Sequence, residues 1–439
     1  MLALNALFQP LPFANRYWVG YSGGMDSHVL LDICVTWWQQ GLIPKPQPVF
    51  IHHHLSPNAD AWAQHCEVIS KTYGLTCRII HVDATPCADE SPEEAARRAR
   101  YTAFADLLAR DELLLIAHHQ RDQAETFLLQ LLRGAGVKGL AAMPFQRALG
   151  QGLLARPLLN CSYEDIVTYA KQRQLQWIED ESNTNLALQR NLIRHTFLPL
   201  IEKHFASAPA VISRSAQHCA TADQLLTELA EIDYQQIKDG CEHTLSISKL
   251  ATLSLIRRDN VLRYWLYQHH IIPSSTQLAE FQQLLFAKAD ANPQIKWPGV
   301  IIRRYRDILT LLPCQTIPAI LKDIVLWDIA EQANLLLPYN LGVLQVTKTI
   351  GLGLSAAKLA GCSITIRFRQ GGERCQPAGR IGSHPLKKCF QEAGVPPWQR
   401  NTIPLLYVND TLTAVIGYWI CEGFAAGLGE AGLLVALHM

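Results

Sequence analysis

A short loop of serine, glycine and aspartate residues lies where the chain could hold a phosphate group. It follows the apolar segment Tyr17–Tyr21 and precedes a segment whose apolar residues recur at helical spacing. Glycines let the backbone approach a phosphate, and a following helix adds amide groups and a favourable dipole. Asp26 does not suit direct phosphate contact, so we expect it to hold Mg²⁺ against a pyrophosphate group. The residues expected to contact the nucleotide here are Ser22, Gly23, Gly24, Met25, Asp26 and Ser27.

The chain has no Walker-type loop, Gly-x4-Gly-Lys-Ser/Thr. The loop SGGMDS resembles instead the PP-loop of the N-type ATP pyrophosphatases, which cleave ATP between the α- and β-phosphates. This resemblance implies ATP as the nucleotide. A serine-glycine turn that merely caps a helix is the alternative interpretation.

A second polar segment, Ala117–Thr126, follows another expected strand. Ligands bind at the carboxyl ends of strands in open α/β sheets, so this segment and SGGMDS should converge. His118, Asp122 and Glu125 have the spacing i, i+4, i+7, which places them on one helix face. They offer a general base and two carboxylates beside a triphosphate. A hydrolytic zinc site and a helix start with polar caps are the alternatives.

Three consecutive histidines, His52 to His54, follow a third apolar run. Successive strand residues face opposite sides, so the three cannot easily share one metal ion. We therefore expect one histidine, His52, near the nucleotide. A further pattern joins the acidic segment Glu179–Asn183 to Arg190 and Arg194, whose spacing of four predicts a positive stripe suited to phosphate contact. A solvated helix face is the alternative for that stripe.

The elements that position these residues alternate between apolar runs and helical segments, which predicts a Rossmann-like parallel α/β sheet. The expected strands are 17–21, 49–52, 78–82 and 113–117. In the first helix Leu30, Ile33, Cys34 and Trp37 form an apolar face. A later helix should start at Ser91, with Pro92 at its first position and Glu94 completing a capping box. Its expected inward face carries Ala96, Ala99, Ala103, Phe104 and Leu107, which leaves Arg97 and Arg98 outward.

Composition bounds the class of protein. The 439 residues are 49% hydrophobic and 18% charged, as in a folded chain of two to four domains. We find no signal peptide and no run of about 20 apolar residues, so we expect a cytoplasmic protein without a membrane span. The twelve cysteines form no Cys-x-x-Cys pair and are expected to be reduced.

The boundaries we expect are a catalytic domain at 1–205, a mainly helical substrate-binding domain at 206–335, and a small α+β domain at 360–439. The segment from Gly361 to Arg400 contains seven basic residues and two acidic ones. Such a basic surface suits a nucleic-acid backbone, although a merely solvated surface is the alternative.

The ordered motifs SGGMDS, HHHLSPNADAW, EEAARRARY, AHHQRDQAET, RPLL and EDESN…RNLIR together resemble those of the tRNA(Ile)-lysidine synthetases. The resemblance covers about the first 200 residues strongly and extends to the tail IRFRQGGERCQPAGRIGSHPLKKCFQEAGVPPWQRNTIPLLY. It implies ligation of free L-lysine to the wobble cytidine of an isoleucine tRNA with a CAU anticodon, through an adenylated base.

The same resemblance suggests roles for individual residues. Asp26, His118 and Asp122 would be catalytic, and Asp122 and Glu125 would hold the substrate lysine. The tRNA contacts would be Arg97, Arg100, Arg190, Arg194, Arg367, Arg369, Arg374, Arg380, Lys387 and Lys388. The cofactors would be ATP and Mg²⁺, and the sequence leaves open whether the protein is a monomer or a homodimer.

Three other functions compete with this one. A PP-loop tRNA thiolase is the main rival, although its cluster-binding Cys-x-x-Cys is absent. A small-molecule amidotransferase or synthetase would leave the basic tail without a use. A non-catalytic tRNA-binding protein is disfavoured by the intact polar residues of the first two motifs.

Overall fold

The computed structural model describes residues 4–88, 90–179, 186, 188–286, 293–314 and 321–438. They form two compact units, residues 1–233 and 234–439, which we describe separately. Among the described residues, no helix is both long and apolar enough to cross a lipid bilayer.

A six-stranded sheet with the strand order β3-β2-β1-β4-β6-β5 organises the first unit. Five of its strands are parallel, and β5 pairs antiparallel with β6. The strands are β1 (Arg16–Gly20), β2 (Gln47–His52), β3 (Arg78–His81), β4 (Glu112–Leu115), β5 (Gln146–Leu149) and β6 (Gly152–Ala155). The four strands predicted from sequence are confirmed, with ends that shift by one or two residues, and so is the parallel α/β class.

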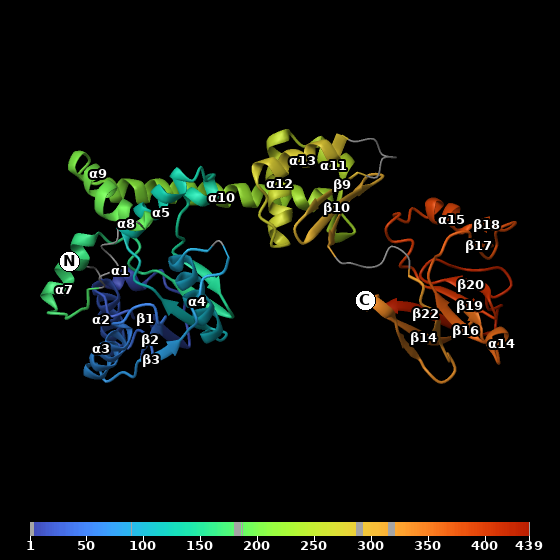
Figure 1. The fold of residues 1–439 in the computed structure, drawn as a ribbon, viewed down its shortest axis with the longest axis horizontal. Coiled ribbons are helices and arrows are strands. Elements are labelled where there is room, and N and C mark those ends of the chain that lie inside the picture. Colours follow the sequence, from blue (N-terminus) through green and yellow to red (C-terminus); the bar gives the residue numbers. More distant parts are fainter. Residues whose placement is uncertain are drawn as a thin grey trace. The chain divides into compact units, whose positions relative to one another are not determined.

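Helices cover both faces of this sheet, with α2 and α3 on one side of the blue strands and α4 on the other (Figure 1). The helices of the first unit are α1 (Leu4–Phe8), α2 (Met25–Gln39), α3 (Ala59–Thr72), α4 (Pro92–Leu107), α5 (Gln120–Leu132), α6 (Val137–Leu140), α7 (Tyr163–Gln172), α8 (Gln189–Leu192), a π-helical turn (Ile193–Phe197), α9 (Leu198–His204) and most of α10 (Ala208–Ile237).

The strands are buried on both faces, as expected for a parallel sheet between helices. In β1, Tyr17 and Val19 pack with α2, α3 and α7, whereas Trp18 packs with α4 on the opposite face. This alternation follows from the two-residue period of a strand. The predicted α2 face is confirmed, because Leu30, Ile33, Cys34 and Trp37 are all buried against the sheet.

The predicted start of α4 is also confirmed. Ser91 is the N-cap, and Ser91 and Glu94 each accept a hydrogen bond from the other's backbone N–H. One detail of its inward face was wrong, since Ala95 is buried while Ala96 is only half-buried. Arg97 and Arg98 point to solvent as expected.

The second unit contains antiparallel sheets rather than a parallel one. A five-stranded sheet, β7-β8-β11-β10-β9, packs with α11, α12 and α13 around Trp265, Phe281 and Leu309. Its elements are β7 (Lys238–Asp239), β8 (Cys241–Ser246), α11 (Ile247–Thr252), α12 (Leu255–Gln268), α13 (Ser275–Phe286), β9 (Gln294–Trp297), β10 (Val300–Tyr305) and β11 (Ile308–Pro313).

The C-terminal part of this unit holds further small sheets, in the orders β12-β16-β19-β20-β21, β13-β14-β22-β15 and β17-β18. Its elements are β12 (Val325–Leu326), β13 (Asn334–Leu336), a 3-10 turn (Pro338–Asn340), β14 (Val343–Ile350), β15 (Leu354–Ser355), α14 (Ala356–Leu359), β16 (Ile364–Arg367), β17 (Arg374–Cys375), β18 (His384–Pro385), α15 (Leu386–Glu392), β19 (Leu405–Val408), β20 (Thr411–Val415), β21 (Trp419–Ile420) and β22 (Ala431–His438). The expected small α+β character is confirmed, while the boundaries 1–205, 206–335 and 360–439 stay a prediction.

Candidate active site

The SGGMDS loop connects β1 to α2 and is closed by its own hydrogen bonds. Ser27 Oγ donates to the Gly24 carbonyl at 2.9 Å and accepts from the Ser22 N–H at 3.2 Å. Gly23 has φ +82°, and a Cβ there would lie 2.8 Å from Ile178 Cδ1. Glycine suits this position because of the positive φ, and a Cβ would also require the end of the Ile178 side chain to move.

The N-terminus of α2 is open to an anion. Its N-cap residue, Gly24, provides no side-chain hydrogen bond to the first backbone N–H groups of the helix. These groups and the positive end of the helix dipole therefore remain available to a phosphate group. Ser22 is exposed beside them, whereas Ser27 is buried and serves the loop's own geometry.

Asp26 lies in the first turn of α2 and has one oxygen without a partner. Its Oδ1 is buried and makes no hydrogen bond, while its Oδ2 lies 3.6 Å from His119 Nε2. A carboxylate oxygen left free beside an anion site is the donor that Mg²⁺ prefers. The arrangement therefore fits the expected role of Asp26 as a magnesium ligand.

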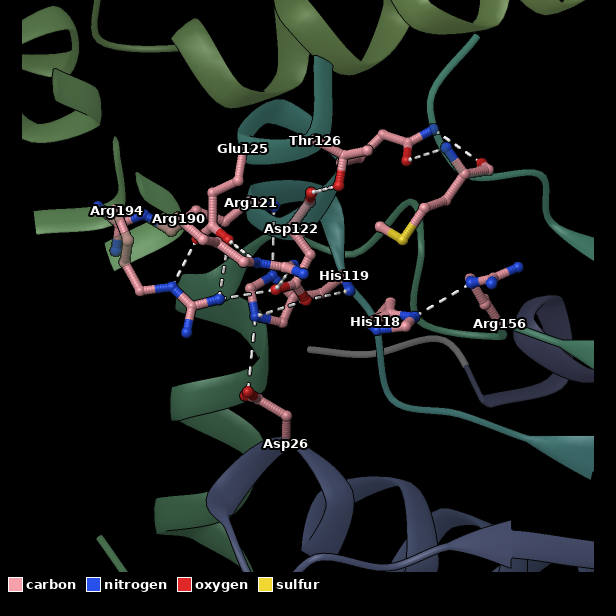
Figure 2. Close-up of polar contacts among 12 residues, drawn as sticks. Asp26, His118, His119, Arg121, Asp122, Glu125, Thr126, Arg156, Arg190 and Arg194 are labelled. Carbon is pink, nitrogen blue, oxygen red and sulfur yellow. Dashed lines mark hydrogen bonds and ion pairs between the residues drawn. The ribbon is translucent and has the colours of Figure 1, made fainter. Parts of the chain in front are cut away.

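His119 connects Asp26 to the second polar segment (Figure 2). It is the N-cap of α5, and its Nδ1 accepts a hydrogen bond from the Arg121 N–H. Its Nε2 therefore faces both Asp26 and Asp122, at 3.6 Å and 3.5 Å. Burial lowers the pKa of His119, but Asp122 and Asp26 outweigh burial and raise it overall. His119 was not predicted from the sequence, because its neighbour His118 has the better helical spacing.

His118 does not share a helix face with Asp122 and Glu125, so that expectation was wrong. The helix begins only at Gln120, because His119 is extended with φ −128° and ψ −176°. The His118 side chain turns away and its Nδ1 accepts from Arg156 Nε at 3.1 Å (Figure 2). Burial, together with Arg156, lowers the pKa of His118 well below its usual range, so the ring is neutral.

Asp122 and Glu125 share the inner face of α5 with two arginines across from them (Figure 2). Arg194 binds both carboxylates, through contacts of 2.8 Å to Asp122 Oδ1 and 2.6 Å to Glu125 Oε1. Arg190 does the same at 3.1 Å and 2.9 Å. Glu125 is fully buried and Asp122 nearly so. Buried charges of this kind persist only when they are paired.

These ion pairs show that Arg190 and Arg194 are engaged with carboxylates, while the phosphate contact expected of the two arginines stays a prediction. Their spacing of four does place both guanidinium groups on one side, but that side faces Asp122 and Glu125. Burial alone would raise the pKa of Asp122, yet His119, Arg190 and Arg194 hold it well below its usual range. Asp122 is therefore an anion at neutral pH. Of the acidic segment before this stripe, Asp180, Glu181, Ser182 and Asn183 lie outside the described residues.

Two of the expected tRNA contacts lie on α4, beside a tyrosine. The guanidinium groups of Arg97 and Arg147 lie 4.9 Å and 4.8 Å from the Tyr101 ring centroid. Arg100 is exposed on the same helix. Arg147 adds positive charge that was not predicted from the sequence, because it belongs to no motif of alternating or helical spacing.

Several basic residues expected to contact tRNA in the second unit are engaged within the protein. Arg380 pairs with Glu392 at 2.6 Å, and Arg367 pairs with Asp410 and covers the Tyr407 ring. Arg369 binds Asn401 Oδ1 at 3.2 Å, and Arg374 binds the Ser383 carbonyl at 2.6 Å. Lys387 and Lys388 are exposed.

His52, the histidine expected near the nucleotide, is buried at the carboxyl end of β2. Its Nε2 is 2.9 Å from Asp60 Oδ1, and its Nδ1 has no partner. The next residue, His53, has its pKa lowered to about 4 by burial and by Arg100. His52 ends β2 on the same side of the sheet as the carboxyl ends of the parallel strands β1 and β4.

Comparison with known proteins covers nearly the whole chain. Residues 2–201 match the family model of the PP-loop domain, 245–310 that of the TilS substrate binding domain, and 364–437 that of the TilS substrate C-terminal domain. The tRNA(Ile)-lysidine synthase of Coxiella burnetii is 43% identical over 425 residues, 95% of this chain and 92% of that protein. Its counterpart in Methylococcus capsulatus is 37% identical over 441 residues, 99% of each chain.

Proposed function

Because the chain belongs to the tRNA(Ile)-lysidine synthase family, we propose that its site joins free L-lysine to the wobble cytidine of an isoleucine tRNA with a CAU anticodon. The enzyme is an ATP-dependent ligase that acts on tRNA. The observation that supports this specific reaction is a chain of contacts from Asp26 through His119 to Asp122. It connects the anion site at the start of α2 to a group of acidic and basic side chains whose charges complement those of an amino acid.

In the first step, oxygen 2 of the cytosine attacks the α-phosphate of ATP, and pyrophosphate leaves. The free N–H groups at the start of α2 hold the departing phosphates, and the closed Ser22–Ser27 loop keeps those groups in place before the reaction. Asp26 Oδ1 would hold Mg²⁺, which supplies positive charge where negative charge develops on pyrophosphate.

In the second step, the lysine ε-amino group attacks carbon 2 of the adenylated base, and AMP leaves with oxygen 2. Asp122 and Glu125 supply carboxylates for the ammonium groups of lysine, and Arg190 and Arg194 supply partners for its carboxylate. The low pKa of Asp122 suits holding a cation rather than accepting a proton. His118 has a neutral ring but points toward Arg156 and away from these carboxylates, so we do not assign it the proton of the lysine amine.

The reacting cytidine has to leave the anticodon stack, since an enzyme cannot reach a stacked base. We propose that Arg97 and Arg100 on α4 contact the tRNA backbone near the site. The exposed Lys387 and Lys388 would bind tRNA from the second unit. We place this reaction in the cytoplasm, where tRNA is modified before translation.

The test is incorporation of labelled lysine into tRNA. Purified protein is incubated with an unmodified isoleucine tRNA carrying a CAU anticodon, ATP, Mg²⁺ and labelled L-lysine. We expect label in the tRNA with one AMP and one pyrophosphate released per lysine. A methionine tRNA with the same anticodon is the control and should remain unlabelled.

The same incubation distinguishes lysine ligation from the sulfur transfer of a thiolase. Replacing lysine with a sulfide donor should give no modified base. Sulfur incorporation, or tRNA binding with no release of AMP, would overturn the proposed function.

A further inference from the structure

A cluster of three histidines lies where β2 and β3 end side by side. His52 is the last residue of β2, and it is in register with His81, the last residue of β3. His54 lies two residues beyond His52. One side-chain nitrogen from each of the three rings lies within 4.8 Å of the others. Among the described residues, no other group of histidine, cysteine or acidic side chains meets this spacing.

Two of the three consecutive histidines meet where the chain leaves β2. His54 lies beyond the strand with φ +57°, and its ring centroid is 4.1 Å from that of His52. The third ring comes from His81 on the neighbouring strand, 27 residues further along the chain. Sequence spacing therefore did not reveal this cluster, because its third ring comes from the neighbouring parallel strand.

Two of the three rings already lie at the nitrogen separation that a shared ion needs, and the third is beside them. His81 Nδ1 and His54 Nε2 are 3.0 Å apart, and the His52 ring centroid is 4.1 Å from that of His54 and 4.8 Å from that of His81. Ligand nitrogens about 2.0–2.1 Å from a zinc ion lie only slightly further apart than 3.0 Å. One of the two hydrogen-bonded nitrogens carries a proton, and a shift of that proton to the other nitrogen of its ring frees both for coordination.

His52 is also held in the form that a metal ligand requires. Its Nε2 donates to Asp60 Oδ1 at 2.9 Å, so its Nδ1 carries a lone pair, and that buried nitrogen has no partner. A carboxylate behind a histidine is the usual way in which proteins orient a metal-binding imidazole. The ring is only 2% exposed, so its orientation is fixed by packing.

The site is accessible from outside. His54 and His81 line a cavity of about 580 Å³ together with His53, Leu55, Asp83 and Thr85. An ion can enter there, and water can complete its coordination. His54 has φ +57°, a conformation that favours glycine, so a histidine at this position bears a backbone cost.

We propose that His52, His54 and His81 bind one divalent transition-metal ion, Zn²⁺ in the first instance, with water as the fourth ligand. Three neutral imidazoles suit zinc, copper or nickel and not Mg²⁺, which prefers oxygen. The ion is thus distinct from the magnesium assigned to Asp26. It would join the ends of β2 and β3.

The test measures metal binding directly, on the full chain without a histidine tag. The protein is stripped with a chelator, and Co²⁺ is titrated while the visible absorption is recorded, followed by competition with Zn²⁺. We expect one ion per chain and the absorption of a four-coordinate cobalt site. His54→Gly and His81→Gln should each weaken binding at least tenfold. Asp60→Asn should weaken it about 10- to 100-fold through His52.

The chain offers a matched control in a second pair of neighbouring histidine rings. His243 and His269 have ring centroids 4.6 Å apart, and no third ligand joins them among the residues that the structure describes. His243→Ala should leave the affinity unchanged. His54→Gly relieves the positive φ, so the metal-free variant should melt no lower than the wild type, and Zn²⁺ should raise the melting temperature of the wild type alone.

Three results would overturn the proposal. They are no stoichiometric Co²⁺ binding, affinity unchanged in both His54→Gly and His81→Gln, or affinity abolished in His243→Ala.

Discussion

At the scale of single residues, the carboxylates of Asp26 and Asp122 differ in their hydrogen-bond and ion-pair partners. Asp26 has a buried oxygen without any hydrogen bond, whereas Asp122 is bound by His119, Arg190 and Arg194. A buried polar atom without a partner is costly unless a ligand satisfies it. Asp26 therefore offers an oxygen to an ion, whereas the carboxylate of Asp122 is already paired within the protein.

Asp26→Asn should remove pyrophosphate release and leave tRNA binding nearly intact. The amide keeps the shape of the side chain but lacks the negative charge that a magnesium ion requires. Pyrophosphate release and tRNA binding are measured separately on the same preparation. Asp106→Asn, an exposed change on α4, is the control and should affect neither. Parallel loss of tRNA binding would assign Asp26 a structural role instead.

Asp122→Asn should lower the free energy of unfolding by about 3 kcal/mol at neutral pH, because it leaves buried arginines with less negative charge. The pKa of Asp122 is lower in the folded protein than the value of about 3.9 expected when unfolded. Its contribution to stability is therefore present above about pH 4 and lost as the pH falls through the folded pKa.

Urea unfolding of the wild type and Asp122→Asn, at neutral pH and at progressively lower pH, measures this difference. The gap between the two proteins should shrink below about pH 4. A gap that stays constant with pH would show that the charge of Asp122 is not what stabilises the fold.

At the scale of elements, the capping box of α4 fixes the start of the helix that carries Arg97 and Arg100. Ser91→Ala removes the acceptor for the Glu94 N–H and should lower the free energy of unfolding by about 1 kcal/mol. The midpoint of urea unfolding measures the change. Thr102→Ala, exposed within the same helix, should not destabilise, because alanine has the higher helix propensity. Equal destabilisation by both would mean that the cap contributes nothing specific.

At the scale of the whole molecule, the proposed chemistry belongs to the first unit, and exposed lysines that would grip tRNA belong to the second. Lys387→Ala together with Lys388→Ala should weaken tRNA binding. The slope of log affinity against log salt concentration should become shallower by about 1 for each phosphate group that the double variant no longer binds. Turnover at saturating tRNA should not change. Lys348→Ala, an exposed lysine on β14, is the control. An unchanged salt slope in the double variant would place the tRNA elsewhere.

Local features were predictable from sequence because neighbouring residues decide them. The strand–loop–helix around SGGMDS, the apolar face of α2 and the capping box at Ser91 each depend on residues within one or two helical turns. Apolar periodicity and the hydrogen-bonding capacity of the cap suffice for such features. The parallel α/β class follows from how these elements alternate along the chain.

What only the tertiary structure decided is which side chains from distant segments meet. The onset of α5 at Gln120 turns His119 toward Asp26 and His118 toward Arg156. Arg190 and Arg194 pair with carboxylates 65 to 72 residues earlier in the chain. The ring of His81 reaches His54 through the pairing of β2 with β3. Sequence spacing cannot determine such contacts, since strand order and helix packing set them. The residues of the SGGMDS loop thus determine its local conformation, whereas the fold determines which side chains from distant segments lie beside it.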